Sequence, residues 1–575
     1  MNNAQIAAVL DEVADLLEIQ AANPFRVRAY RNGARTVREL SEPAATILCT
    51  AGRKLTEFKG IGSDLADKIA ALCQTGSMPL HQELLAQIPV SVLTLMRVPG
   101  VGPKKAAALN KELGISTLDE LRAACQAGRV RKLKGFGEKT EQTILAGMEL
   151  AGSVNQRLTW AEVDGFAQSL MTHLRACPSI AELEPAGSYR RGRDSVADLD
   201  LLVVSSNPAE VMDRLAAFAA VETLLGRGDT KMSVRLAGGL QVDLRVVPAE
   251  SFGAAWQYFT GSKDHNVELR SRAKSRGLKI NEYGVFRGDQ YVAGRTEEEV
   301  YATLDLPWFP PELREARQEF AWADAGQLPK LIETGDMQGD LHMHTTATDG
   351  RASLAEMVAA AQDRGLKYIA ITDHSKRVSM ANGLDATRLR AQWAEIDRLN
   401  KSLRGLVVLK GVEVDILEKG GLDLEDDVLA EADWVVASLH YGQQQPREQI
   451  TRRIVDALAN PHVCAIAHPT GRLINRRKPY DVDLDAVFRA ARQHGKFLEL
   501  NSHPQRLDLD DVACAAAKSH GIPIVISTDA HGVEGLDKLR FGILQARRGG
   551  LTKADVVNTR PWAQVKKLLR DRRAK

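Results

Sequence analysis

The sequence has few features of a membrane-bound or secreted protein. It contains no apolar run that approaches the roughly 18 residues needed to span a bilayer, and acidic residues interrupt its N-terminal segment from Asp11 onward. Its six cysteines are scattered and form no CxxC pair, a pattern typical of free thiols in a reducing cytoplasm. We therefore expect a cytoplasmic protein that makes no contact with a membrane.

An excess of charge of one sign is also lacking. The 76 Lys and Arg residues nearly balance the 74 Asp and Glu residues, which leaves a formal net charge of +2. This balance neither requires nor excludes a nucleic-acid partner, so local clusters of charge must decide. With 44% hydrophobic and 26% charged residues, the 575-residue chain has the composition of a globular protein. At about 150 residues per domain, we expect about four domains.

The first 150 or so residues carry three Gly-x-Gly turns, each of which ends an apolar segment and opens a helix. Glycine lets the backbone approach a ligand closely, and the helix start offers free N–H groups to a phosphate. Ordinary turns between helices are the alternative. The three turns resemble helix-hairpin-helix motifs, which grip the DNA backbone without reading its sequence, and in that family the hairpin carbonyls also hold K⁺ or Na⁺. The glycines are Gly60, Gly62, Gly100, Gly102, Gly135 and Gly137.

A cluster of arginines, Arg26, Arg28, Arg31 and Arg35, precedes the first turn. Alone, such a cluster would be a solvated helix face. Residues 23–31 resemble the N-terminal domain of DNA polymerase beta and its relatives, the family X polymerases, which implies that the arginines contact a downstream 5′-phosphate. Lys68 matches the family's lysine that forms a Schiff base with an abasic sugar. Asp64 and Asp67 nearby favour its protonated form, so a phosphate contact is the alternative role for Lys68.

From about residue 180 to 250 the pattern changes to strands. Asp198 and Asp200 lie two residues apart and therefore on one face of a strand, and Asp243 lies in a second alternating strand. Three carboxylates that converge from adjacent strands would bind two Mg²⁺ or Mn²⁺ ions. Such ions would activate a primer 3′-hydroxyl and neutralise a triphosphate.

Motifs around these strands strengthen this interpretation. Residues 187–192 resemble the nucleotidyltransferase GS motif, in which a Gly-Ser turn and an arginine contact phosphate oxygens. Residues 258–262 resemble the family X segment that packs against the incoming sugar, Asn266 matches the residue that faces the incoming base, and residues 281–284 resemble the thumb. Lys263 stands where polymerase beta has an acid, and we expect it to hold a nucleotide before the template binds. The expected nucleotide contacts are Gly187, Ser188, Arg191, Tyr258, Phe259, Gly261, Ser262, Lys263 and Asn266.

The last 240 or so residues alternate β-rich runs with helix-length segments. Seven such runs predict a parallel α/β barrel, distorted because it has one strand fewer than the usual eight. Catalytic side chains in such barrels lie at the C-terminal strand ends. The runs are residues 340–344, 368–372, 406–414, 434–440, 463–468, 497–500 and 522–528.

Nine His, Asp and Glu residues lie at or just past these strand ends, and they include six of the 13 histidines of the chain. A single buried histidine is usually structural, but nine such residues at one face indicate a cluster of two or three metal ions. Mixed His and carboxylate ligands suit Zn²⁺, Mn²⁺ or Fe²⁺, and such a cluster would activate water for attack on a phosphate ester. The pattern resembles the polymerase and histidinol phosphatase (PHP) domain, whose nine ligand positions are all filled here. The resemblance leaves Asp373 and Glu499 outside the ligand set. The nine are His342, His344, Asp349, His374, Glu413, His440, His468, Asp529 and His531.

In its order of motifs, the chain resembles a bacterial family X DNA polymerase with a C-terminal PHP domain. We expect a multidomain fold with a helical helix-hairpin-helix N-terminal region, an α+β nucleotidyltransferase palm with a thumb, and a distorted (β/α)7 barrel. The expected domains are 1–80 (polymerase beta-like N-terminal domain), 81–160 (fingers with helix-hairpin-helix motifs), 161–247 (palm), 248–318 (thumb), 319–335 (linker) and 336–575 (PHP phosphoesterase).

The resemblance implies a repair polymerase that fills short gaps in base excision repair, with a 3′–5′ exonuclease in the barrel. Its expected partners are gapped or nicked duplex DNA and a dNTP, and we expect a monomer. A PHP nuclease with a weak polymerase is one alternative, which nucleotide incorporation on a gapped template would distinguish. A non-catalytic scaffold that binds DNA ends is the other, and the metal content of the protein would test it.

Overall fold

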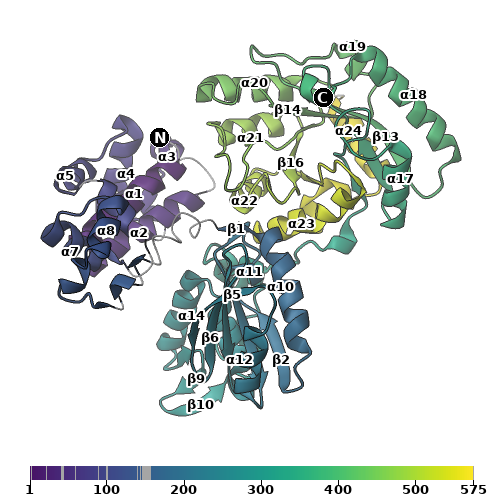
Figure 1. Cartoon of the computed structure of the whole chain (residues 1–575). Helices are drawn as coiled ribbons and strands as arrows, with labels where there is room; N and C mark the ends of the chain where they lie inside the picture. Colours follow the sequence, from purple (N-terminus) through teal and green to yellow (C-terminus); the bar gives the residue numbers. More distant parts are fainter. Residues whose placement is uncertain are drawn as a thin grey trace. The chain divides into compact units, whose positions relative to one another are not determined.

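The structure is a computed structural model. It describes residues 157–573 without a break and most of residues 1–145, with gaps at 2, 21, 41–43, 59, 89, 97, 99–100, 139 and 143; residues 146–156 and 574–575 lie outside it. The chain divides into two compact units, Met1–Gln156 and Arg157–Lys575, and each is described by itself (Figure 1). None of the helices formed by the described residues combines the length and apolarity that a membrane crossing requires.

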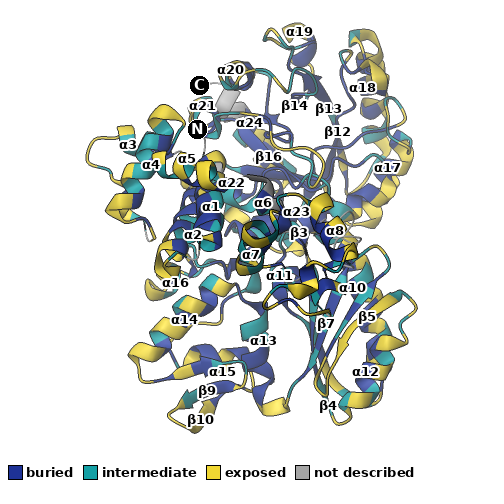
Figure 2. Ribbon diagram, turned by 60° about the vertical axis from the view of Figure 1, so that its left-hand side comes forward, coloured by how far each residue is buried: buried dark blue, intermediate teal, exposed yellow. Residues whose placement is uncertain are grey.

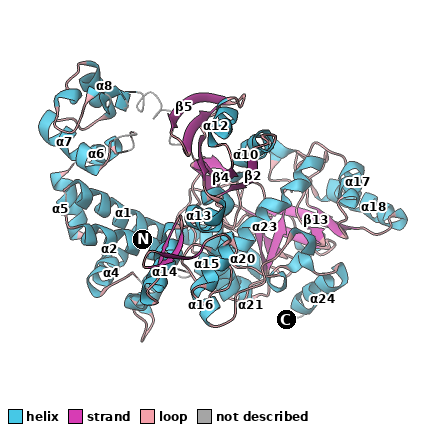
Figure 3. Cartoon of the chain, turned by 90° about the horizontal axis from the view of Figure 1, so that it is seen from below, coloured by secondary structure: helices cyan, strands magenta, loops and turns pink. Residues whose placement is uncertain are grey.

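The first unit is helical in its described residues (Figure 3). Apolar residues at helical spacing in its first helix, among them Ile6, Leu10, Val13 and Leu17, are buried in one core that extends through the unit. The elements are α1 (Asn3–Ile19), α2 (Pro24–Glu39), α3 (Ala44–Cys49), η1 (Leu55–Glu57), α4 (Ser63–Thr75), α5 (Pro79–Gln87), α6 (Val90–Leu95), α7 (Pro103–Leu113), α8 (Leu118–Gln126) and η2 (Val130–Lys132).

The second unit begins with an α+β segment, which we call the palm. Its five-stranded sheet has the order β2-β4-β7-β6-β5, and only β4 and β7 run parallel. Alternating residues of β4, β6 and β7 are buried against two helices, so a slip of one residue would expose them. The elements are β1 (Leu158–Thr159), α10 (Trp160–Arg175), β2 (Ile180–Pro185), α11 (Gly187–Arg190), β3 (Ser195–Val196), β4 (Asp198–Ser205), α12 (Pro208–Ala216), β5 (Val221–Arg227), β6 (Lys231–Leu236) and β7 (Gln241–Val246).

The thumb follows the palm. Its three short antiparallel strands share a core with the helices on either side of them in the chain, and Tyr301 and Phe309 are fully buried there. The elements from here to the barrel are η3 (Ala249–Ser251), α13 (Phe252–Thr260), α14 (Lys263–Ser275), β8 (Lys279–Asn281), β9 (Gly284–Arg287), β10 (Gln290–Ala293), α15 (Glu297–Ala302), η4 (Pro311–Leu313), α16 (Glu319–Asp324) and η5 (Thr334–Asp336).

A buried ion triad joins the palm to the thumb. Arg190 at the end of α11 donates two hydrogen bonds to Glu297 at the start of α15, at 2.6 and 2.8 Å, and Arg314 donates a second pair at the same two distances. Burial raises the pKa of Glu297, but the two guanidiniums lower it, with a net fall to about 2. Glu297 therefore stays charged and fixes α11 against the thumb.

The predicted seven-stranded parallel barrel is confirmed, with its strands paired in chain order. The strands are β11 (Gly339–Asp340), β12 (Tyr368–Ile371), β13 (Val407–Asp415), β14 (Trp434–Ser438), β15 (Ala465–Ile466), β16 (Phe497–Asn501) and β17 (Ile524–Ser527). The helices are α17 (Leu354–Asp363), α18 (Ala386–Ser402), α19 (Asp426–Leu429), α20 (Arg447–Ala459), α21 (Leu484–Gln493), α22 (Asp511–Ser519), α23 (Leu539–Arg548) and α24 (Trp562–Arg573), with short turns η6 (Ser379–Ala381), η7 (Val533–Lys538), η8 (Lys553–Asp555) and η9 (Val557–Thr559).

The first barrel strand is shorter than predicted. Regular pairing with β12 ends at Asp340, so His342 and His344 follow the strand instead of lying within it. Backbone hydrogen bonds from Asp529 to His342 and from His344 to Ala530, at 2.9 and 2.8 Å, nevertheless join the two ends of the sheet, so the barrel is nearly closed.

The barrel has an inner and an outer apolar layer. Tyr368 and Ala370 of β12 belong to the inner cluster, whereas Ile369 and Ile371 pack outward against the helices. Val565 of α24 joins the inner cluster. The strands are accordingly buried on both faces (Figure 2).

Replacement of Glu297, which both arginines contact, tests how much the triad contributes to the stability of the fold. Glu297→Ala would leave Arg190 and Arg314 buried without a counter-charge, at a cost of about 3 to 5 kcal/mol in the free energy of unfolding. Denaturant titration of the full chain measures the loss, and Glu298→Ala, at the exposed next position, is the matched control. Equal unfolding midpoints for the two variants would contradict this account.

Candidate active sites in the palm and the barrel

Three carboxylates meet on the palm sheet. β4 carries Asp198 and Asp200 on one face, and Asp243 on the parallel neighbour β7 is in register with Asp200. Ser233 on β6 donates a hydrogen bond to one oxygen of Asp243, and Gln241 Nε2 donates to the other at 2.9 Å. The structure therefore brings the three residues together as the alternating pattern predicts.

The turn before these strands passes directly over them. Gly187, the first residue of α11, has φ of +63°, and a Cβ at this position would lie 2.3 Å from Oδ2 of Asp200. Only glycine allows both the backbone conformation and this approach. The GS turn is thus held against a carboxylate that the sequence assigns to metal binding.

The positive groups around the palm carboxylates do not offset the repulsion between their negative charges. Burial, and then repulsion from Asp198 and Asp243, raise the pKa of Asp200 to about 7. Burial and repulsion from Asp243 also raise the pKa of Asp198. A divalent cation between the carboxylates would relieve this repulsion, and their oxygen atoms suit Mg²⁺ or Mn²⁺. The residues present therefore fit a divalent-metal site.

In the barrel, Glu413 at the end of β13 lies at the centre of the predicted ligand set. Its Oε1 is 3.0 Å from Nε2 of His468 and 3.5 Å from Nε2 of His440, and its Oε2 is 2.7 Å from Nδ1 of His374. Burial raises the pKa of Glu413, but the neighbouring imidazoles of His374, His440 and His342 outweigh burial and lower it well below the usual range. Glu413 is therefore a carboxylate surrounded by nitrogen donors.

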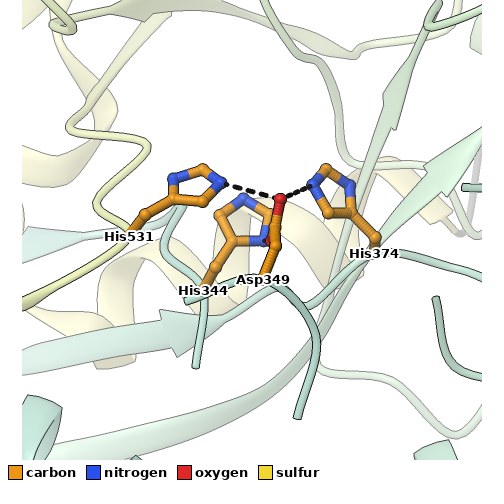
Figure 4. A group of neighbouring side chains, drawn as sticks. All are labelled: His344, Asp349, His374 and His531. Atoms are coloured by element: carbon orange, nitrogen blue, oxygen red, sulfur yellow. Dashed lines mark ion pairs between the residues drawn. The ribbon is translucent and has the colours of Figure 1, made fainter. Parts of the chain in front are cut away.

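Side chains from several strand ends form three groups in which each residue offers a ligand atom within 4.8 Å of the others. In the largest group, Asp349 Oδ2 lies 3.5 Å from Nε2 of both His374 and His531 (Figure 4). His468 completes the nine predicted ligands through its contact with Glu413. The groups are His344, Asp349, His374 and His531; His342, His344 and Asp529; and His374, Glu413 and His440.

Several buried nitrogen atoms in this cluster lie near carboxylates without making a well-aligned hydrogen bond to them. Nε2 of His342 and both ring nitrogens of His344 are buried, yet none makes a well-aligned hydrogen bond within residues 157–573. Burial, and then repulsion from His374 and His531, lower the pKa of His344 to about 4, which keeps its ring neutral. A neutral, buried imidazole whose nitrogens make no well-aligned hydrogen bond is available to a metal ion, so the barrel residues also fit a metal centre.

Other residues orient the ligands. Nδ1 of His342 lies 2.7 Å from Glu499, and Asn501 donates a hydrogen bond to Asp529 at 3.0 Å. Asp373 accepts hydrogen bonds from Thr345 Oγ1 and Gln392 Nε2, both at 2.6 Å, and so holds the loop that follows His344. Glu499 thus contacts a candidate ligand directly, and Asp373 contacts the loop beside one.

Asp415 was missed by the sequence analysis. It is fully buried, and one of its oxygens is 3.1 Å from Nδ1 of His440 and accepts a hydrogen bond from the backbone N–H of His440 at 3.1 Å. Its position two residues after Glu413, on the same face of β13, was the signal that could have found it.

Four family models match parts of the chain. They are a helix-hairpin-helix domain over residues 1–78, a SAM-like helix-hairpin-helix tandem over 92–149, the DNA polymerase beta thumb over 255–315 and the PHP domain over 340–503. These ranges follow the order of the motifs in the sequence.

A relative covers the whole chain. DNA polymerase/3′-5′ exonuclease PolX of Bacillus subtilis (strain 168) is 39% identical over 579 residues, which span 99% of this chain and 100% of that protein. The chain belongs to the PolX family, the bacterial family X DNA polymerases with a C-terminal PHP domain. A probable phosphatase of Thermoanaerobacter sp. (strain X514) is 29% identical over 247 residues, 41% of this chain and 96% of that protein. A probable phosphatase of Acetivibrio thermocellus is 33% identical over 201 residues, 33% of this chain and 78% of that protein.

In this chain, the expected nucleotide contacts of the thumb lie close to one another. Asn266 accepts a hydrogen bond from Gln257 Nε2 at 2.8 Å and donates one to the carbonyl of Tyr258 at 2.7 Å. The rings of Tyr258 and Phe259 meet edge to face, with centroids 5.2 Å apart. These contacts fix the segment that the sequence predicts to lie beside an incoming nucleotide.

The turn between α13 and α14 holds the remaining expected contacts. Ser262 caps α14 by accepting a hydrogen bond from the backbone of His265, and Lys263 is exposed at the first turn of that helix. Gly261 lies beside Arg191, whose guanidinium donates to the carbonyl of Thr260. Ser188 is in α11, next to Gly187.

In the helical unit, the turns have the backbone that glycine favours. Gly60 and Gly135 have φ of +98° and +87°, and Gly62 and Gly102 are the N-caps of α4 and α7. Gly137 ends the third turn, and Gly100 lies outside the described residues. Gly62 and Gly102 thus present free helix N-termini.

The arginine cluster is divided between the surface and internal ion pairs. Arg26 and Arg28 are exposed, and Arg35 is half-buried. The guanidinium of Arg31 is paired with Asp15 of α1 and lies 3.6 Å from Asp11. Arg31 therefore joins α2 to α1, a use that its position in the sequence did not reveal.

Lys68 is held in its charged form. Its Nζ lies 2.6 Å from Oδ2 of Asp64. Burial lowers the pKa of Lys68, but the hydrogen bond with Asp64 and the interaction with Tyr30 outweigh burial and raise it above the usual value. A Schiff-base lysine must lose its proton, so this surrounding favours a phosphate contact.

The repulsion in the palm predicts a pH-dependent stability. The pKa of Asp200 in the folded chain is raised from 3.8 to about 7, so between these pH values the folded chain keeps a proton on Asp200 that the unfolded chain has lost. The folded state therefore loses stability as the pH rises from about 4 to about 7. In EDTA at pH 8, Asp200→Asn should therefore be more stable than the unchanged chain by on the order of 2 to 4 kcal/mol, a gap that shrinks toward pH 4. Thermal unfolding measures this, with the exposed Asp229→Asn as control. A gap independent of pH would exclude the repulsion as its cause.

Asp415 offers a test of ligand orientation in the barrel. Asp415→Asn keeps the size of the side chain but weakens its hold on Nδ1 of His440, so Mn²⁺ affinity should fall about 10- to 100-fold. Titration of the EDTA-treated chain with Mn²⁺ measures this, and the exposed Asp427→Asn should bind as the unchanged chain does. Equal affinities for both variants would show that Asp415 does not support the site.

Proposed function

We propose that the chain fills short gaps in duplex DNA and trims primer 3′ ends in base excision repair. As a member of the PolX family, it is a DNA polymerase with a 3′–5′ exonuclease. One observation carries the proposal. The chain aligns over 99% of its length with a PolX protein, and it has two sets of candidate ligands, one on the palm sheet and one around Glu413.

In the palm, Asp198, Asp200 and Asp243 would hold two Mg²⁺ or Mn²⁺ ions, which lower the pKa of a primer 3′-hydroxyl and neutralise the triphosphate. Asp243 is the base that receives the proton of this hydroxyl, and hydrogen bonds from Ser233 and Gln241 hold its carboxylate in place. Each added nucleotide releases pyrophosphate.

The incoming nucleotide is held by both palm and thumb. Ser188 and Arg191 bind the triphosphate oxygens, and Gly187 keeps their turn close to Asp200. Asn266 faces the base, and its two hydrogen bonds support its orientation. Lys263 reaches the triphosphate before the template binds. The residues that pack against the sugar are Tyr258, Phe259, Gly261 and Ser262.

In the barrel, the nine ligands would hold two or three Zn²⁺ or Mn²⁺ ions, which activate water for in-line attack on the terminal phosphodiester. Glu499, Asp415 and Asn501 keep His342, His440 and Asp529 oriented toward the ions. The product of this step is a DNA primer shortened by one nucleotide.

The helical unit would bind the DNA on either side of the gap. The helix starts after Gly60-Ile61-Gly62 and the two later turns contact backbone phosphates, with K⁺ or Na⁺ at the hairpin carbonyls. Arg26, Arg28 and Arg35 reach the downstream 5′-phosphate, and Lys68 contacts a neighbouring phosphate. We leave Arg31 out of this set because its charge is paired with α1.

We further propose the domain division 1–80, 81–160, 161–247, 248–318, 319–335 and 336–575. The matches to family models at 1–78, 92–149, 255–315 and 340–503 support four of these segments. The proposals of a monomeric state and a cytoplasmic location rest on the sequence.

A labelled primer beside a gap of one nucleotide tests both activities at once. With Mn²⁺ and a downstream 5′-phosphate, we expect the primer to lengthen by one nucleotide when dNTPs are present and to shorten when they are absent. Gel electrophoresis of the primer gives both results. A primer that stays unchanged in both conditions would exclude the enzymatic function and favour a DNA-end-binding scaffold.

Variants separate the two sites. Asp198→Asn with Asp200→Asn should lose extension by about 1,000-fold or more, because several kcal/mol of charge stabilisation disappear, while shortening continues. His374→Ala should do the reverse. If the palm variant extends as well as the unchanged chain, extension does not take place at these carboxylates.

A further inference from the structure

A helix of the barrel packs directly against the GS turn of the palm. Gln545 of α23 donates a hydrogen bond to the carbonyl of Gly192 at 3.0 Å, and a Cβ at Gly192 would lie 2.5 Å from the side chain of Leu544. Phe541 of the same helix meets the ring of Trp160 at 5.8 Å. The turn that joins the GS motif to the strand with Asp198 and Asp200 is therefore built partly from the barrel (α23 is drawn in yellow in Figure 1).

The last residue of α23, Arg548, binds three acceptors at once. Its Nη1 donates to the carbonyl of Arg191 at 2.7 Å and to Glu315 Oε1 at 3.0 Å, and its Nη2 donates to Asp511 Oδ2 at 2.7 Å. Only 2% of its side chain is exposed. Arg548 thus ties the GS motif, the end of the thumb and helix α22 of the barrel together.

Glu315 is shared between this arginine and the GS motif. Arg191 Nε donates to the same Oε1 of Glu315, at 3.2 Å. Burial raises the pKa of Glu315, but Arg548 and then Arg191 outweigh burial, and the pKa falls to about 2. A carboxylate that serves two guanidiniums holds each of them less firmly than it would hold one alone. Loss of Arg548 would therefore leave Glu315 to Arg191 and to Arg193, whose Nη1 lies 3.7 Å from Oε2 of Glu315.

We propose that Arg548 of the barrel is a positioning residue for the polymerase site: it holds Glu315 and the backbone of Arg191 so that the guanidinium of Arg191 can bind the triphosphate of the incoming nucleotide. Arg548 acts through Arg191 and does not bind the nucleotide itself. The inference rests on the triphosphate-binding role proposed above for Arg191. It makes the barrel a structural part of the polymerase as well as a second active site.

Single-nucleotide gap filling by the full chain, measured over a range of dNTP concentrations, tests the inference. Arg548→Met should raise KM for the dNTP about 10-fold or more, the effect of losing a hydrogen-bonded charge, and leave kcat within about twofold. Shortening of the primer without dNTPs reports that the barrel is intact. Arg547→Met is the matched control, because Arg547 bonds instead with Glu312 and the carbonyl of Ile332.

A second substitution distinguishes positioning from general packing. In Arg548→Met with Glu315→Gln, the carboxylate that would retain Arg191 has lost its charge, so KM should return toward that of the unchanged chain. If Arg548 only filled space, the double variant would be as impaired as the single one or more so, which would overturn the inference. Should Arg548→Met fail to fold, Arg548→Lys keeps the charge but reaches fewer acceptors and should give an intermediate KM.

The outcomes separate this inference from the proposed function. An unchanged KM in both Arg548→Met and Arg548→Lys overturns the positioning role while gap filling stands. An unchanged chain that incorporates no nucleotide overturns the proposed function and this inference with it.

Discussion

Neighbouring parallel strands that bring candidate metal ligands together are the constraint on which both sites depend. In the palm, the register of β4 with β7 sets Asp200 beside Asp243 and raises the pKa of Asp200 to about 7. In the barrel, parallel strands bring Glu413 among imidazoles, some of which lack a hydrogen-bond partner within residues 157–573. The palm carboxylates repel one another when no cation lies between them. The barrel cluster holds buried imidazole nitrogens that make no well-aligned hydrogen bond within residues 157–573, which suits a bound metal. The strand registers therefore determine which candidate ligands lie together in each site.

Much of this arrangement could be predicted from the sequence because it depends on local periodicity. Asp198 and Asp200 must share a face of any strand that contains both, and the seven apolar runs required strands that are buried on both sides. The position of each ligand relative to a strand end then places it at the catalytic face. Even so, His342 and His344 follow a strand whose regular pairing with β12 ends at Asp340, although backbone hydrogen bonds still join them to the segment after β17.

Pairings between distant residues could not be predicted in this way. Arg548 and Arg191 are separated by 357 positions, and no pattern near either one indicates that α23 would reach the GS turn. Arg31 had the sequence context of a DNA contact, yet its guanidinium is paired with Asp15. Asp415 lies on the same strand face as Glu413, but its contact with His440 depends on where the segment after β14 places that histidine. A long side chain can reach several partners, and the positions of all the elements in the folded chain determine which of them it contacts.

Anomalous diffraction from crystals of the full chain grown with Mn²⁺ tests the central claim most directly, because it locates the ions without relying on activity. The account predicts anomalous peaks between Asp198, Asp200 and Asp243, and two or three more among the nine barrel ligands around Glu413. Peaks confined to surface carboxylates, with none at either site, would contradict the claim that strand register creates two metal centres in one chain.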